Sequence, residues 1–264
     1  MNRTKQVWIN FVFFAVTLAV NAMGATGLIN GLTQEEISNR YITLITPSPA
    51  TFSIWGVIYS LLIIAMIAMI VKKDEPYYQS AIDQISNLFR LSSILNIAWI
   101  VSFSYVLVEI SVLFILGFVI TLALISQRLL RIHQPKRWLL PASFGMYGGW
   151  LFVATVVNTA AALVKMNWSG FGLSQETWGI IMLIVAVLLL IVILTNLKNA
   201  VFPLPVAWAY FGIYQFLKSP DGFNGEFTNL QFVALVGSIV LVAVALYQLY
   251  HNKFSVLPET DTIN

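Results

Sequence analysis

The chain has no cysteine and very few charged residues for its length. Lys, Arg, Asp and Glu make up 9% of its 264 residues, whereas hydrophobic residues make up 59%. The absence of cysteine excludes disulfides, a thiolate nucleophile, iron–sulfur clusters and cysteine-ligated zinc. The scarcity of charge, with a mean hydropathy of +0.83, excludes an ordinary soluble domain. The composition is that of an integral membrane protein.

Several kinds of functional group are also scarce. The net charge of +3 gives no support for a nucleic-acid partner. The two histidines, His133 and His251, fall in expected loops, which argues against a buried haem with an axial histidine. No Cys–His pair, no carboxylate pair within a span and no glycine-rich phosphate loop occurs, so we expect neither an enzyme nor a required cofactor. No ionisable residue lies well inside an expected span, which argues against a proton-coupled carrier.

Eight stretches are long and apolar enough to cross a bilayer. They lie near residues 7–28, 51–71, 87–106, 109–129, 143–164, 177–196, 202–218 and 228–250. The connection at 29–50 is the longest, and Thr33 followed by Glu36 has the spacing of a capping box, which predicts a short helix across that mouth. Pro203 and Pro205 predict the start of the seventh span.

The basic residues fit both termini on the cytoplasmic side. With that orientation, 11 of the 14 lie inside: Arg3, Lys5, Lys72, Lys73, Arg90, Arg128, Arg131, Lys136, Arg137, Lys198 and Lys253. The other three, Arg40, Lys165 and Lys218, lie outside. An alternative is cleavage after a signal peptide near Ala22-Met23-Gly24, which would leave seven spans, but the apolar pattern continues through Leu28.

The stretch PSPATFSIWGVIYSLL, residues 47–62, combines a proline-primed helix start with two aromatic residues. We expect Pro49 at the entry and a membrane helix from Phe52 onward. Trp55 and Tyr59 are four residues apart, so they share one helix face. They form either an interfacial aromatic belt or a ledge that faces other helices.

Asparagine and tryptophan recur in register on two other spans. Asn96, Trp99 and Phe103 share one face of the third span, and Trp150, Ala154 and Asn158 share one face of the fifth, with Thr155 beside them. Gly148 and Gly149 leave room for a close neighbour. Amides in lipid need partners, so Asn96 and Asn158 should point inward, either as links between helices or as ligand contacts.

These motifs resemble one known family. FSIWGVIY in the second span, LNIAW in the third and GGWLFVATVVN in the fifth are similar to the TspO/MBR family, which comprises tryptophan-rich sensory proteins and the translocator protein, or peripheral-type benzodiazepine receptor. The resemblance covers roughly residues 7–165. It implies a five-helix bundle around a pocket for porphyrins, sterols or aromatic drug-like ligands, with residues 29–50 as a lid.

The resemblance also implies which residues bind the ligand. The matching positions are Trp55, Tyr59, Asn96, Trp99, Phe103, Trp150, Ala154, Thr155 and Asn158. The family's third-span pattern W-x-P-x-F reads Trp99-Ile100-Val101-Ser102-Phe103 here, so no proline kink is expected. The W-V-F-x-P run ahead of the second-span tryptophan is replaced by Pro49-Ala50-Thr51-Phe52-Ser53.

The sequence thus predicts an all-α, polytopic membrane bundle of about eight helices. We expect a TspO/MBR-like core at 1–165 and three additional spans with a short tail at 166–264. The expected function is binding or sensing of a flat hydrophobic ligand, with a bound porphyrin held without histidine ligation as one case. Transport of that ligand is the alternative, and a porphyrin-modifying enzyme is a weaker one. Expected partners are this small molecule and the bilayer, with a homodimer as a further option, in a multi-pass location such as a bacterial cell membrane.

Overall fold

A computed structural model describes residues 2–134 and 138–258. Within these residues the chain forms nine α-helices and two short 3-10 helices. Their bounds are α1 Arg3–Ala25, α2 Gln34–Arg40, η1 Pro49–Ser53, α3 Ile54–Val71, α4 Pro76–Ser104, α5 Val108–Leu130, α6 Leu139–Lys165, η2 Gly170–Gly172, α7 Gln175–Leu197, α8 Pro203–Lys218 and α9 Thr228–His251. The expected all-α class is therefore confirmed.

Seven helices in the described residues are long and apolar enough to cross a membrane. They are α1, α3 together with η1, α4, α5, α6, α7 and α9. The remaining expected span, the seventh at 202–218, corresponds to α8, which begins at Pro203 as predicted but has only 16 residues. At 1.5 Å per residue its length is about 24 Å, short of a typical hydrocarbon core of about 30 Å.

The start of α4 is the largest difference from the expected boundaries. The sequence placed the third span at 87–106, whereas α4 begins at Pro76 and runs without a break to Ser104. Its first turns contain Gln79, Asp83 and Gln84, so hydropathy does not reveal them. The third-span proline of the family is absent here, and α4 continues through this region without a kink. The Ser102 hydroxyl donates to the Ala98 carbonyl at 2.7 Å.

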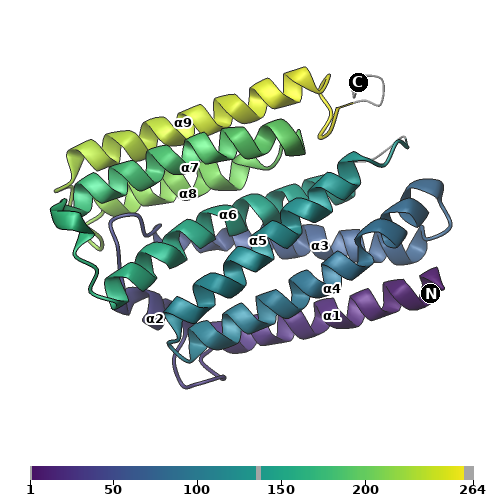
Figure 1. The fold of residues 1–264 in the computed structure, drawn as a ribbon, viewed down its shortest axis with the longest axis horizontal. Coiled ribbons are helices and arrows are strands. Elements are labelled where there is room, and N and C mark those ends of the chain that lie inside the picture. The colour runs from purple at the N-terminus through teal and green to yellow at the C-terminus, as the bar shows by residue number, and fades with distance from the viewer. Residues whose placement is uncertain (1, 135–137, 259–264) are drawn as a thin grey trace.

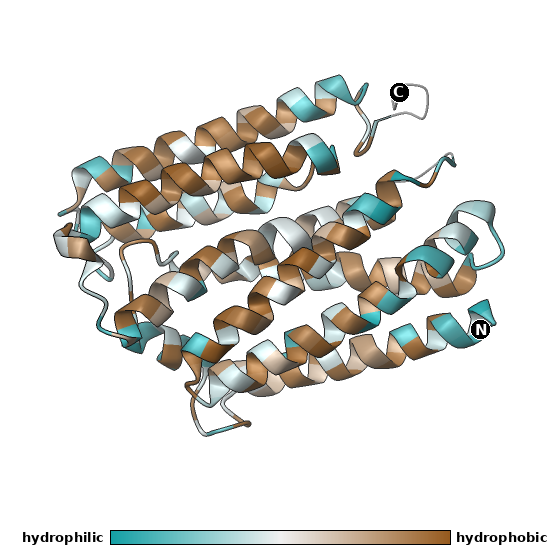
Figure 2. Cartoon of the chain, viewed as in Figure 1, coloured by the Kyte–Doolittle hydropathy of each residue, from teal (hydrophilic) through white to brown (hydrophobic). Residues whose placement is uncertain are grey.

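The long helices lie side by side and alternate in direction (Figure 1). The start of α1 and the end of α9 lie at one end of the bundle, which we call the terminal end. The short helix α2 lies at the opposite end, which we call the lid end. Hydrophobic residues dominate the outer faces of the helices, and hydrophilic residues gather toward the ends (Figure 2). This pattern is typical of helices surrounded by lipid.

Helices α7, α8 and α9 form a second group that packs against α6 through α8. At Gly149 a side chain would overlap the Phe202 carbonyl oxygen, and at Gly148 it would contact the Phe202 ring at 3.1 Å. The room predicted at these two glycines is therefore used by the start of α8. Within the group, the Tyr210 hydroxyl donates to the Leu183 carbonyl at 2.7 Å, which satisfies a buried phenol.

Arg90 lies midway along α4, whereas the sequence placed it near the start of the third span, and its partners lie in the first turns of α1. Its guanidinium donates to Asn10 Oδ1 of α1 at 2.9 Å and to the Gln6 carbonyl at 3.4 Å. Because the span begins eleven residues earlier than hydropathy indicated, this cation lies inside the helix instead of at its start. It joins α1 to α4.

Candidate functional site

The predicted lid contains a short helix that is capped as its sequence indicates. The Thr33 hydroxyl accepts from the Glu36 backbone N–H at 3.1 Å, and Glu36 Oε2 accepts from the Thr33 N–H at 2.7 Å. The bond from the Thr33 backbone N–H to the carboxylate is the main reason why the pKa of the Glu36 carboxyl lies below its ordinary value. Ile37 on the next turn is fully buried and packs with Val108 and Ala161. The capping box and this side chain fix α2 over the ends of α5 and α6.

The second half of the lid is held by α8. Residues 46–53, which we call the lid arm, run from α2 toward α3. The Ser48 backbone N–H donates to the Gly212 carbonyl at 3.0 Å, and Trp208 Nε1 donates to the Thr51 carbonyl at 2.9 Å. The Thr51 side chain is buried against Gly212, where a Cβ would overlap it. The second of the three additional helices, α8, therefore supports the lid directly.

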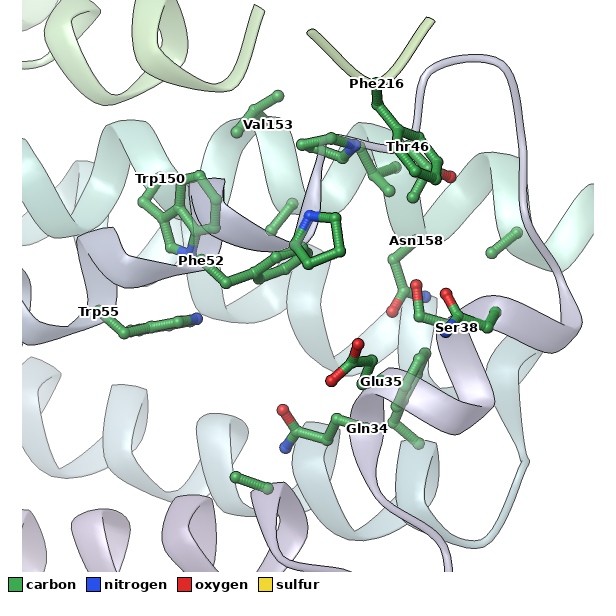
Figure 3. A pocket seen from close by; sticks show the side chains of 18 of the residues that line it. Gln34, Glu35, Ser38, Thr46, Phe52, Trp55, Trp150, Val153, Asn158 and Phe216 are labelled. Carbon is green, nitrogen blue, oxygen red and sulfur yellow. The ribbon is translucent and has the colours of Figure 1, made fainter. Parts of the chain in front are cut away.

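A cavity of about 320 Å³ lies under the lid, between α3, α4 and α6. This volume is at the lower end of those found for small-molecule pockets. Figure 3 shows Phe52, Trp55 and Trp150 on one side and Gln34, Glu35 and Ser38 of α2 on another, with Phe216 of α8 closing the top of the view. The lining residues are Ala25, Gln34, Glu35, Ser38, Asn39, Thr46, Pro47, Pro49, Phe52, Trp55, Trp99, Phe103, Trp150, Val153, Ala154, Val157, Asn158, Ala161 and Phe216.

The aromatic wall is organised around Trp55. Its ring stacks on Tyr59, with centroids 5.1 Å apart and planes 18° apart. Its edge contacts Trp150 and Tyr147, each at 6.1 Å between centroids. Of the two alternatives that the sequence left open for this ledge, the inward-facing one is correct, because Trp55 lines the cavity and packs on α6. Offset and edge-on ring contacts of this kind are favourable beyond area burial.

Asn158 lines the cavity and also joins three helices. Its Oδ1 accepts from Trp99 Nε1 of α4 at 3.1 Å, and its Nδ2 donates to the Ser111 hydroxyl of α5 at 2.9 Å. These bonds satisfy a side chain that is 6% exposed. Because the amide holds the Trp99 indole, it positions one of the cavity's aromatic rings.

Six of the nine predicted site residues come together at the cavity, and three do not. The six are Trp55, Trp99, Phe103, Trp150, Ala154 and Asn158. Tyr59 lies behind Trp55, and the Thr155 hydroxyl donates to the Leu151 carbonyl of its own helix. Asn96 is fully buried between α1, α4 and α6, where it accepts from Asn21 Nδ2 at 2.6 Å and donates to the Tyr147 hydroxyl at 3.1 Å.

Sequence reasoning did not identify the lining residues from the lid and from α8. Gln34, Glu35, Ser38 and Asn39 come from α2, which was predicted as a helix across the mouth but without assigned contacts. Their i, i+1, i+4 and i+5 spacing on a capped helix was the available signal. Phe216 gave no such signal, because its place in the wall depends on how α8 packs.

An ion pair fastens the lid end of the bundle beside the cavity. Lys165 Nζ at the end of α6 donates to Glu109 Oε2 at 2.6 Å and to the Val106 carbonyl at 2.7 Å. Glu109 lies in the first turn of α5. Both side chains are partly exposed, so the pair holds the α4–α5 turn against α6 more than it stabilises the whole fold.

Comparison with known proteins supports the resemblance and extends it. Neither the curated proteins nor the solved structures give a significant match. A family model described as TSPO-like protein matches residues 7–247, from α1 into α9. The match includes the lid, the aromatic wall and the three helices that follow α6. The chain therefore belongs to the TSPO-like protein family.

Proposed function

We propose that the protein binds a flat hydrophobic ligand in the cavity under the lid and acts as a membrane-embedded receptor for it. The observation that carries this proposal is the convergence of six aromatic side chains on one cavity: Phe52, Trp55, Trp99, Phe103, Trp150 and Phe216. Aromatic faces offer stacking and a large apolar area, while Asn158 and the polar residues of α2 can orient polar edges. The cavity volume suits two or three fused rings better than a whole porphyrin macrocycle.

The family as a whole supports a binding or transport role over catalysis. The described cavity lining contains no cysteine, histidine or lysine, so its side chains favour holding a ligand over transforming it. Ligand retention would then rest on ring contacts and hydrogen bonds, without a ligated metal.

We further propose that α8 crosses the membrane as the eighth span. It returns the chain from the end of α7 to the start of α9, so these two helices point the same way (Figure 1). Its 16 residues are packed between helices of the bundle, with Val206, Ala209 and Ile213 buried, so local protein contacts replace part of the lipid. Eight crossings put both termini on one side, which the basic residues favour as the cytoplasmic side.

Binding of acridine, an uncharged three-ring fluorophore in mildly alkaline buffer, tests the proposed site. Trp150 is 2% exposed and contacts both Phe52 and Trp55, so it supports the whole wall. We expect Trp150→Phe to weaken acridine binding about fivefold and Trp150→Ala to weaken it more. Mass spectrometry of protein purified from native membrane would identify the natural ligand.

Trp178→Ala is the matched control. Trp178 packs on Trp168 at 4.9 Å between ring centroids and donates to the Gly170 carbonyl, away from the cavity. We expect its loss to leave acridine binding unchanged in protein that elutes as folded. Equal losses at Trp150 and Trp178, or no loss at either, would show that the cavity does not bind this class of ligand.

A further inference from the structure

The cavity is acidic as well as aromatic. Among its described lining residues, Glu35 carries the one formal charge, and no lysine, arginine or histidine is present. The remaining polar groups are neutral amides and hydroxyls of Gln34, Ser38, Asn39, Thr46 and Asn158. Any ligand that enters this cavity therefore passes one negative charge, on the exposed side chain of Glu35, and no positive charge among the described lining residues.

Glu35 is free to interact with a ligand. It lies in the first turn of α2, and its carboxylate points into the cavity in Figure 3. It forms no ion pair or hydrogen bond with any residue that the structure describes. Its neighbour Glu36 is different, because its carboxylate accepts the Thr33 backbone N–H of the capping box. The nearest basic residue on the lid helix, Arg40, lies at its far end and does not line the cavity.

The aromatic residues that line the same cavity as Glu35 favour the same sign of ligand charge. Tryptophan faces attract cations through the ring quadrupole, and three tryptophans line this cavity. Trp55 and Trp150 meet at 82° between ring planes and Phe52 meets Trp150 at 89°, so the rings form a corner instead of a flat slot. Aromatic corners of this type recognise quaternary and protonated amines. Two independent features, a carboxylate and several rings, therefore attract positive charge.

We infer that the ligand is a hydrophobic ring system that carries a positive charge, such as a protonated or quaternary amine, with that charge directed at Glu35. The inference rests on the proposed function and names the class of ligand for the same cavity. A ligand with carboxylates, such as a free porphyrin, would bring negative charge toward Glu35. The described lining has no basic residue to pair with those carboxylates, so such a ligand is disfavoured. A neutral ring would use the aromatic wall alone.

Three probes with the same ring system and different charge separate these cases: N-methylacridinium, uncharged acridine and acridine carboxylate. Binding is measured by fluorescence with the full-length protein in nanodiscs of uncharged lipid, so that membrane charge does not bias the probes. We expect affinity to fall in the order cation, neutral, anion. The affinity for the cation should also fall with added salt, whereas that for acridine should not.

Glu35→Gln keeps the shape of the side chain and removes its charge. We expect it to weaken binding of N-methylacridinium about fivefold, to leave acridine unchanged and to remove the salt dependence. Glu35→Lys should reverse the order of cation and anion. Glu176→Gln is the control, because Glu176 lies in the first turn of α7 at the same end of the bundle but outside the cavity. It should leave all three affinities unchanged.

The outcomes distinguish this inference from the proposed function. Equal affinity for cation and neutral probe, or no effect of Glu35→Gln, would overturn the inference if Trp150→Ala still weakens acridine binding. Insensitivity of every probe to Trp150→Ala would overturn the binding site itself, and the charge preference with it. If Glu176→Gln weakens binding of N-methylacridinium as much as Glu35→Gln does, the effect comes from general surface charge. That result would also overturn the inference.

Discussion

At the scale of single residues, the two asparagines that looked alike in the sequence have different surroundings. Asn96 is fully buried, and both ends of its amide bond to protein groups on other helices. Asn158 is almost as buried but has one side on the cavity and holds the Trp99 indole. The same residue type thus joins helices at one position and positions a cavity ring at the other.

Alanine at each asparagine should separate these roles. We expect Asn96→Ala to lower the free energy of unfolding by about 0.5 to 2 kcal/mol and to leave acridine affinity in the folded protein unchanged. Asn158→Ala should lower both stability and affinity, because Trp99 loses its partner. Thermal denaturation and fluorescence titration of the same samples measure the two effects.

The double variant provides the check. The two amides belong to separate hydrogen-bond networks, one with Asn21 and Tyr147 and the other with Trp99 and Ser111. We therefore expect their stability losses to add within about 0.5 kcal/mol. Strong non-additivity in affinity would instead mean that both amides address one ligand, as the family resemblance implies.

At the scale of elements, the sequence predicted best those features that depend on local chemistry. Thr33 and Glu36 form the capping box, Pro203 starts α8, and most span boundaries lie within a few residues of the helices observed. The start of α4 was missed because polar residues such as Asp83 lie on a helix that extends beyond the apolar run. Hydropathy reports burial in lipid, whereas this segment is stabilised by α1, where Arg3 pairs with Asp83 at 2.7 Å.

The candidate site shows the same division. The rings of α3, α4 and α6 were predicted because their spacing puts them on one helix face and the motifs are specific. The lid residues and Phe216 depend on contacts between segments far apart in the sequence, such as Ser48 with Gly212 and Trp208 with Thr51. No periodicity within one helix contains that information.

A substitution at Gly212 tests whether α8 supports the lid. Alanine there would overlap the buried Thr51 side chain and push the lid arm away from α8. We expect Gly212→Ala to destabilise the protein by about 1 to 3 kcal/mol and to weaken acridine binding, because the arm carries Phe52. Thermal unfolding and titration again provide the measurements.

Two further variants make the test specific. Gly56→Ala introduces the same methyl group in a helix at a position with no atom within 4 Å, so it should be neutral or slightly stabilising. Adding Thr51→Ala to Gly212→Ala removes the two closest atoms, Oγ1 and Cγ2, leaves the Thr51 Cβ at 2.9 Å, and should recover part of the lost binding. No recovery would mean that Gly212 acts through the conformation of α8 and not through the lid arm.

At the scale of the whole molecule, the three helices after α6 act as a support for one side of the cavity. The packing of α8 on α6 at Gly149 and on the lid arm at Gly212 caps one side of the bundle. The family match across residues 7–247 agrees with a structure in which these helices are an integral part. The lid helix α2, whose residues line the cavity, lies at the end of the bundle opposite the start of α1 and the end of α9 (Figure 1).

The direction of the chain across the membrane follows from this arrangement and from charge. The described basic residues at helix ends divide unequally: Lys5, Lys72, Arg128, Lys198 and Lys253 are among those at or near the terminal end, whereas Arg40, Lys165 and Lys218 are at the lid end. Lys136 and Arg137, also expected inside, lie outside the described residues. Positive charge is retained on the cytoplasmic side, so the lid and cavity should open to the opposite side.

Single-cysteine labelling tests this orientation, and the cysteine-free chain is a ready background for it. We expect an impermeant maleimide to label Phe171→Cys in intact cells, because Phe171 is 82% exposed near the lid end. Lys5→Cys and Lys253→Cys should react only after the cells are opened, since the proposed eight crossings put both on one side and the basic residues favour the cytoplasmic side. Labelling of Lys253→Cys but not Lys5→Cys in intact cells would mean that α8 does not cross and that seven spans are correct. Labelling of both, with Phe171→Cys protected, would keep eight crossings but invert the protein, so that the cavity would receive its ligand from the cytoplasm.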